Sequence, residues 1–158
     1  MCAHLAIKKF VQSMCVLLIG AVSSGAALAA GPDPARALTA SDPKLKWGAC
    51  PDFMPKGCGL AVLHGDPTKE NADVFLRVPA KSTLPMHIHT SAERMILTAG
   101  EMQVTSEGQP MAVLKAGSYA YVPAKRPHKA SCISAAPCIL FIAFEQPVDA
   151  MAVGATTK

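Results

Sequence analysis

Three histidines and one glutamate form the pattern in this sequence that most clearly suggests chemistry. His87 and His89 are separated by one residue, Glu93 follows soon afterwards, and His128 lies further along the chain. Because alternate side chains of a β-strand point to the same face, a strand through His87 and His89 would present both imidazoles on one side. Imidazole nitrogens and a carboxylate oxygen are suitable ligands for a divalent transition metal. The pattern therefore predicts a metal site, provided that the fold brings Glu93 and His128 to the histidine pair.

The region that contains these residues is predicted to form a series of short β-strands. Turn residues, chiefly glycine and proline, interrupt apolar or alternating runs along most of the chain after residue 59. Strands are predicted at 60–63, 74–78, 84–89, 94–98, 102–105, 111–114, 119–122, 129–133 and 139–144. No stretch of this region keeps a sustained helical period. Short strands separated by regular turn signals are typical of an all-β sandwich or barrel.

The spacing of the site residues resembles two sequence motifs of the cupin superfamily, a group of small jelly-roll β-barrels. The first motif has two histidines separated by one residue, then a glutamate and a glycine, and the matching residues are His87, His89, Glu93 and Gly100. The second has a glycine, a proline and a histidine, and the matching residues are Gly117, Pro123 and His128. The resemblance covers roughly residues 60–144 and implies an all-β fold with a single jelly-roll cupin barrel.

Three positions depart from these motifs. Lys81 stands where the first motif usually begins with glycine, Lys125 stands where the second motif has another glycine, and Cys132 stands where asparagine is usual. A lysine at the Lys125 position predicts an altered turn near the site. None of the three departures removes a predicted metal ligand.

The resemblance implies a role for each of the four site residues. His87, His89 and His128 would bind a metal through imidazole nitrogens, and Glu93 would bind it through a carboxylate oxygen. Such a site leaves room for water or a substrate, as catalysis requires. These ligands suit Fe, Mn, Ni, Zn or Cu alike, so the metal stays open. The alternative is a cupin that binds no metal, in which the four side chains are polar fillers of the barrel.

Other side chains near the motifs suggest further roles. Tyr119 and Tyr121 share one face of a predicted strand and could bind a substrate, as could Arg94; alternatively, the tyrosines pack at the barrel rim and Arg94 is solvated. Met86 and Met95 leave a copper site with thioether ligands as another alternative, although methionines inside a barrel usually pack in the core.

The N-terminal segment predicts an exported protein. Lys8 and Lys9 precede an apolar run at 10–19, and Ala27-Leu28-Ala29 fits a signal-peptidase site, so residues 1–29 are predicted to be a cleaved signal peptide. The alternative is an uncleaved membrane anchor. The predicted location is the periplasm or the exterior, with 30–59 as an arm and loop, 60–146 as the cupin barrel and 147–158 as a tail.

Four cysteines remain after the predicted cleavage, which would remove Cys2 and Cys15. An even number of cysteines in an exported chain suggests disulfides. Three pairings are possible, and the local one is favoured, with a disulfide that staples the N-terminal loop: Cys50–Cys58 and Cys132–Cys138. A cysteine-rich metal site is the less favoured alternative, because these spacings are wider than those of zinc motifs.

Charge and motifs together limit the function classes. The formal net charge is only +4 at pH 7, and two of the lysines lie in the predicted signal, which argues against nucleic-acid binding. The sequence favours an exported metal-binding protein, and its resemblance to the cupins implies action on a small oxygenated molecule, as a dioxygenase or an isomerase. The alternative is a non-catalytic periplasmic module that binds a metal or a small molecule. No stable membrane insertion is expected after cleavage, and a homodimer is one option.

Overall fold

The computed structural model describes residues 34–154, and the predicted signal peptide with Cys2 and Cys15 lies outside the described residues. The described part contains eleven β-strands and no helix. Accordingly, no helix in this part of the chain could cross a membrane. All the strands belong to one unit that begins at Arg36.

The strands follow the chain closely, with short turns between most of them. Their bounds are β1 Trp47–Ala49, β2 Gly59–His64, β3 Ala72–Val78, β4 Thr83–Ile88, β5 Glu93–Ala99, β6 Glu101–Ser106, β7 Ala112–Lys115, β8 Tyr119–Val122, β9 His128–Cys132, β10 Cys138–Phe144 and β11 Met151–Ala152. Each of the nine predicted strand regions corresponds to one of these strands, β2 to β10.

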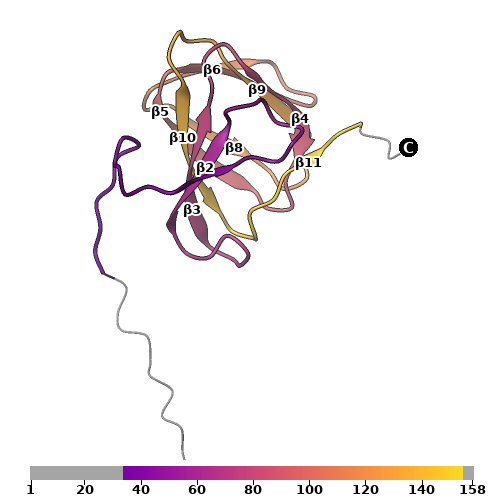
Figure 1. Ribbon diagram of the computed structural model, residues 1–158. Helices are drawn as coiled ribbons and strands as arrows, with labels where there is room; N and C mark the ends of the chain where they lie inside the picture. Colours follow the sequence, from indigo (N-terminus) through magenta and orange to yellow (C-terminus); the bar gives the residue numbers. More distant parts are fainter. Residues whose placement is uncertain (1–33, 155–158) are drawn as a thin grey trace, which may run out of the picture. The chain divides into compact units, whose positions relative to one another are not determined.

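Two antiparallel sheets form the fold (Figure 1). One has the strand order β1-β2-β3-β10-β5-β8, and the other has the order β11-β4-β9-β6-β7. Strand β10 pairs with β3 on one side and β5 on the other, although β10 is distant from both in sequence. The predicted all-β fold class with a cupin-type barrel is confirmed.

Because side chains alternate along each strand, the inward-facing ones form a core between the two sheets. Along β5, Glu93, Met95 and Leu97 are buried, whereas the residues between them face outward. Leu97, with Met102 and Ile142 of neighbouring strands, is almost completely buried. Burial of side chains of this size stabilises the fold by roughly 1.5–3 kcal/mol each. The same alternation that buries the core therefore directs Glu93 inward.

Strands β1 and β11 lie outside the predicted bounds of the barrel, 60–146. Strand β1 pairs with β2, and β11 pairs with β4, with Ala152 opposite His87. Both strands are very short and have no alternating apolar pattern of their own. Their extended conformation depends on pairing with a neighbouring strand, which a local reading of the sequence does not detect.

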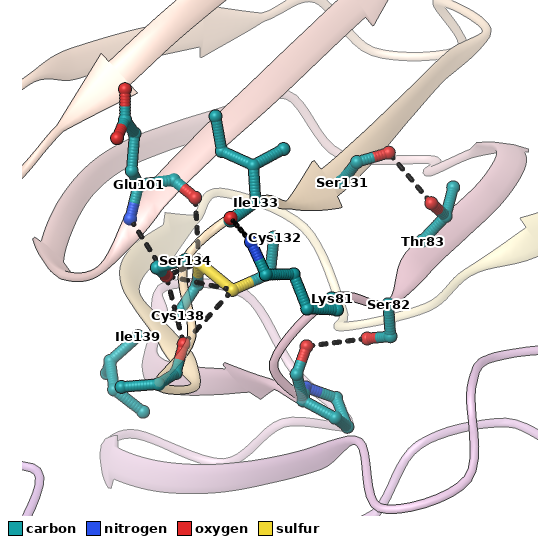
Figure 2. Close-up of a disulfide and its surroundings, with 12 residues drawn as sticks. Lys81, Ser82, Thr83, Glu101, Ser131, Cys132, Ile133, Ser134, Cys138 and Ile139 are labelled. Carbon is teal, nitrogen blue, oxygen red and sulfur yellow. Dashed lines mark hydrogen bonds between the residues drawn. A yellow bond between two sulfur atoms is a disulfide. The ribbon is translucent and has the colours of Figure 1, made fainter.

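Both disulfides have the predicted local pairing, Cys50–Cys58 and Cys132–Cys138. Figure 2 shows the second disulfide, with Ser134 beside it. Gly100, the glycine of the first motif, has φ of 85°, and a Cβ built on it would lie 2.8 Å from Cys138 Sγ. This glycine is therefore required both by its backbone conformation and by the disulfide that packs against it.

The two lysines at motif glycine positions keep a glycine-like backbone. Lys81 has φ of 56° and Lys125 has φ of 60°. The backbone N–H of Lys125 donates to the carbonyl of His89 at 2.8 Å, which fastens this turn to the site. The prediction of an altered turn is therefore not supported by the backbone: lysine adopts the left-handed conformation at a cost of roughly 1–2 kcal/mol.

Candidate metal centre

Three strands bring the four predicted ligands to one place. His87 lies in β4 and is paired across the ladder with His128, the first residue of β9. His89 follows β4 directly, and Glu93 begins β5 after a short turn. All four side chains are buried, with exposed fractions of 3–7%.

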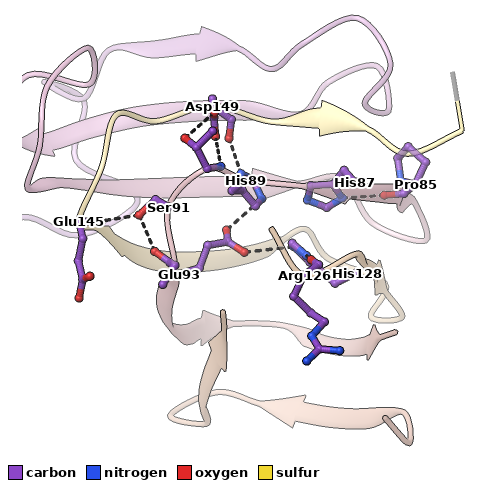
Figure 3. Close-up of polar contacts among 11 residues, drawn as sticks. Pro85, His87, His89, Ser91, Glu93, Arg126, His128, Glu145 and Asp149 are labelled. Carbon is purple, nitrogen blue, oxygen red and sulfur yellow. Dashed lines mark hydrogen bonds and ion pairs between the residues drawn. The ribbon is translucent and has the colours of Figure 1, made fainter. Parts of the chain in front are cut away.

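The ligand atoms of these residues point toward one another (Figure 3). Nε2 of His89 lies 3.4 Å from Oε1 of Glu93, and Nε2 of His128 lies 3.1 Å from Oε2. One ring nitrogen from each of His87, His89 and His128 lies within 4.8 Å of those of the other two. The three ring nitrogens therefore surround a common point, and the Glu93 carboxylate lies beside two of them, those of His89 and His128.

Hydrogen bonds to backbone carbonyls fix the orientation of all three rings. Nδ1 of His87 lies 2.7 Å from the carbonyl of Pro85, and Nδ1 of His128 lies 3.0 Å from that of Arg126. Nδ1 of His89 contacts the carbonyl of Asp149. Because a carbonyl can only accept a hydrogen bond, each Nδ1 carries the proton. In the neutral ring, the lone pair is then on Nε2, as a metal requires.

Two buried polar atoms at the centre have no hydrogen-bond partner among the described residues: Nε2 of His89 and Oε2 of Glu93. The 3.1 Å contact between Oε2 and His128 Nε2 is an ion-pair contact rather than a hydrogen bond. Buried polar atoms are almost always paired, so unpaired ones indicate a missing partner. A divalent metal would bind both atoms, and this donor set fits Fe, Mn, Ni, Zn or Cu.

Burial and mutual contacts shift the pKa values within the cluster. Burial, together with repulsion from His128, lowers the pKa of His87 to about 4. Burial also opposes the charge on His128, but the contact with Glu93 outweighs it and raises the pKa of His128. For Glu93 burial raises the pKa, while the contacts with His128 and His89 hold it below its usual value. The metal-free cluster thus favours a neutral His87 and an ion pair between His128 and Glu93.

A cavity of about 270 Å³ adjoins the four ligands. Its wall is mainly apolar and includes side chains from both sheets, among them Leu60, Leu76, Leu84, Met95, Met102, Val104, Leu140, Ile142 and Phe144. The Cys50–Cys58 loop contributes Met54, and the segment before β11 contributes Val148 and Asp149. Among the described residues that line it, none is lysine or arginine.

The structure does not bring the other predicted substrate-binding residues to this cavity. Tyr119 and Tyr121 are 59% and 55% exposed, because in β8 it is Val122 that turns inward. Arg94 also faces outward, where its guanidinium pairs with the carboxylate of Glu145. None of the three lines the cavity.

Two residues that hold the site in place were not predicted. Asp149 accepts the hydrogen bond from His89, and it lies in the segment predicted to be a tail. Ser91 is almost completely buried, and its hydroxyl accepts from the backbone N–H groups of Glu145 and Gln146 at 3.0 and 3.1 Å. A lone serine or aspartate without a motif gives no sequence signal for such a contact.

Comparison with protein families matches the ChrR cupin-like domain over residues 36–148. The chain belongs to this family. The match includes all four predicted ligands and extends beyond the predicted barrel at both ends, to the arm and to Val148. No curated protein matches the chain.

Solved structures with the same fold differ widely in sequence. The DMSP lyase DddQ from Ruegeria pomeroyi DSS-3 has a TM-score of 0.62 at 18% identity, over 72% of this chain and 64% of that one. A cupin 2 conserved barrel domain protein from Rhodopseudomonas palustris has a TM-score of 0.54 at 12% identity, over 62% and 68%.

Oxalate decarboxylase from Bacillus subtilis has a TM-score of 0.55 at 18% identity, over 64% of this chain and 29% of that one. This chain therefore spans less than two thirds of the lyase and under a third of the decarboxylase. At these identities the likeness establishes a shared fold.

Proposed function

We propose that this protein binds one divalent transition metal through His87, His89, Glu93 and His128 and uses it to act on a small oxygenated molecule. The observation that carries the proposal is the set of three imidazoles whose Nδ1 protons are all held by carbonyls, around two buried atoms without a hydrogen-bond partner. In the absence of a metal, only the ion-pair contacts of Glu93 with His89 and His128 offset the cost of burying these polar groups. The arrangement is readily understood as a preformed ligand set.

The residues of the chain have separate tasks in this proposal. A bound metal would supply Lewis acidity or, if redox-active, dioxygen chemistry. The three histidines and Glu93 hold the metal, the carbonyls of Pro85, Arg126 and Asp149 keep the rings in place, and the apolar wall excludes water. Dioxygenase and isomerase reactions are the proposed classes. The lyase and the decarboxylase among the structural neighbours have different activities, so they do not choose between these classes.

A non-catalytic metal- or small-molecule-binding module is the second candidate. Apart from the four ligands, Asp149 is the one titratable side chain among the described lining residues, and its carboxylate already accepts from Thr90. An acid or base for proton transfer would therefore have to come from the ligands themselves or from the bound molecule. This observation favours the module.

Export to the periplasm or exterior is also part of the proposal. Two disulfides are expected in an oxidising compartment, which supports the predicted signal peptide at residues 1–29. Mass spectrometry of the protein from a periplasmic fraction tests this directly. Chains that retain residues 1–29 would contradict cleavage.

Elemental analysis of the purified protein tests the metal site. We expect about one metal ion per chain in the wild type and in His64→Ala, which removes a histidine that does not line the cavity. We expect His87→Ala to lose at least about tenfold in metal affinity, because one ligand is missing. Equal metal content in wild type and His87→Ala would show that the site is wrong.

The metal-loaded protein then separates the two candidates. Turnover of a catechol-like, diketone or sugar substrate supports the enzyme, and the same substrates should be inert with His128→Ala. Tight metal uptake without turnover of any of them favours the binding module.

A further inference from the structure

The polar side chains that line the cavity are the four predicted metal ligands and Asp149. The remaining side chains of the wall are apolar or are the cysteines of the Cys50–Cys58 disulfide. Leu140, Ile142 and Phe144 come from β10, while Leu84 and Met102 come from the opposite sheet. A molecule in this cavity would therefore meet hydrocarbon and thioether groups from both sheets.

The charge of the wall restricts what can bind. No lysine or arginine lies among the described lining residues, so a charged group away from the ligand cluster would have no partner. Burying an unpaired charge is far more costly than burying an unpaired neutral polar group. A molecule with one oxygen-bearing end fits, whereas a molecule that places a second charge against this wall does not.

The volume of the cavity restricts the size of the molecule that it can bind. A buried apolar cavity of about 150 Å³ already accommodates benzene. The present cavity, at about 270 Å³, is larger and also contains the polar cluster. A substituted single ring or a branched chain of similar size would fill it without expanding the barrel.

From these features we propose that the cavity binds a small, predominantly apolar molecule that has one oxygen donor and no charge on its hydrocarbon body. The identification of this molecule as a substrate rests on the proposed function. The preference for an uncharged body depends on the wall alone and holds with or without metal.

Two probes of matched shape test this preference: para-methylacetophenone and para-acetylbenzoate, which carry a methyl and a carboxylate at the same position. Binding of each is measured by calorimetry to the full protein, both metal-free and metal-loaded. We expect the methyl compound to bind at least tenfold more tightly than the carboxylate to the metal-free form, in which no metal attracts the carboxylate to the ligand cluster. Equal affinity in that form, or tighter binding of the carboxylate, overturns the inference.

A pair of variants locates the binding. Ala130 lines the cavity from β9, and Ala112 is exposed on β7 of the same sheet. We expect Ala130→Leu to weaken binding of para-methylacetophenone at least tenfold and Ala112→Leu to leave it unchanged. An equal effect of both variants would contradict binding in this cavity. If Ala130→Leu does not fold, the comparison of the two probes on the wild type still decides the question.

The outcomes distinguish this inference from the metal proposal. Selective binding of the methyl compound by a protein that takes up no metal supports the cavity preference and refutes the metal site. Metal uptake by a protein that binds neither probe refutes the cavity preference and leaves the metal site intact.

Discussion

His89 donates its Nδ1 proton to the backbone carbonyl of Asp149, sixty residues further along the chain. The carboxylate of Asp149 in turn accepts from the backbone N–H and the hydroxyl of Thr90 at 2.9 and 2.7 Å. Beyond Asp149, strand β11 pairs with β4 at Ile88 and His87. The C-terminal segment is thus fastened to the part of the chain that carries two predicted metal ligands.

Asp149→Ala is expected to weaken metal binding roughly tenfold. This is the lower end of the range observed when a group that orients a metal ligand is removed. The backbone carbonyl remains in this variant, but the two contacts that position it against Thr90 are lost. Asp149→Asn keeps one acceptor oxygen and should recover most of the affinity. Competition with a chelator measures the metal affinity. Unchanged affinity in Asp149→Ala would mean that Asp149 does not help to position His89.

Gly100→Ala and Gly117→Ala should differ in stability, although both glycines belong to the motifs and have positive φ. A Cβ on Gly100 would lie 2.8 Å from Cys138 Sγ and 2.9 Å from Ser134 Oγ, whereas a Cβ on Gly117 meets nothing within 4 Å. Alanine at Gly117 therefore costs only the backbone strain, about 1–2 kcal/mol. Urea unfolding should show a larger loss for Gly100→Ala. Equal losses of unfolding free energy in the two variants would show that the Cys132–Cys138 disulfide moves away from the added Cβ at no cost in stability.

Lys125→Gly is expected to raise the free energy of unfolding by roughly 0.5–1 kcal/mol, since relief of the left-handed strain outweighs the greater entropy of glycine in the unfolded chain. Lys115→Gly is the control, because Lys115 is an exposed residue of β7 and glycine weakens a strand. Thermal or urea unfolding measures both variants. A loss of stability in Lys125→Gly would show that the lysine side chain contributes more than its backbone strain costs.

Metal-free protein should lose stability as the pH falls from about 6.5 toward 4. In the folded chain the pKa of His87 is lowered to about 4, so this residue stays neutral over a range in which the unfolded chain, with a usual value of 6.5, takes up a proton. The unfolded state therefore binds more protons, and stability falls by at most about 1.4 kcal/mol per pH unit from this residue. Above pH 6.5 its contribution is complete.

Urea unfolding in the presence of a chelator at pH values across this range measures the slope. His87→Gln should flatten it, because the group that resists protonation is gone. A slope that is the same in wild type and His87→Gln would assign the pH dependence to other residues.

Much of the site was predictable because its pattern is local. The alternation of a strand places His87 and Glu93 inward, and the motif spacing connects them with His128. The local disulfide pairing was favoured because each pair is close in sequence and flanks turn-like residues, and the structure has this pairing. Family resemblance supplied the ligand set, since nothing in the chain itself states that β4 and β9 are neighbours.

Other features were decided only by the tertiary structure. The direction of Tyr119 and Tyr121 could not be predicted, because the alternate residues Ala120 and Val122 are apolar too and either face of β8 could have been buried. The role of Asp149 depends on β11 pairing with a strand distant in sequence, and a backbone carbonyl leaves no trace in residue type. The sequence by itself therefore determined the strands and the inward direction of the histidine pair, and resemblance to a family added Glu93 and His128 as predicted ligands. Strand register and long-range backbone contacts determined how these four side chains are held.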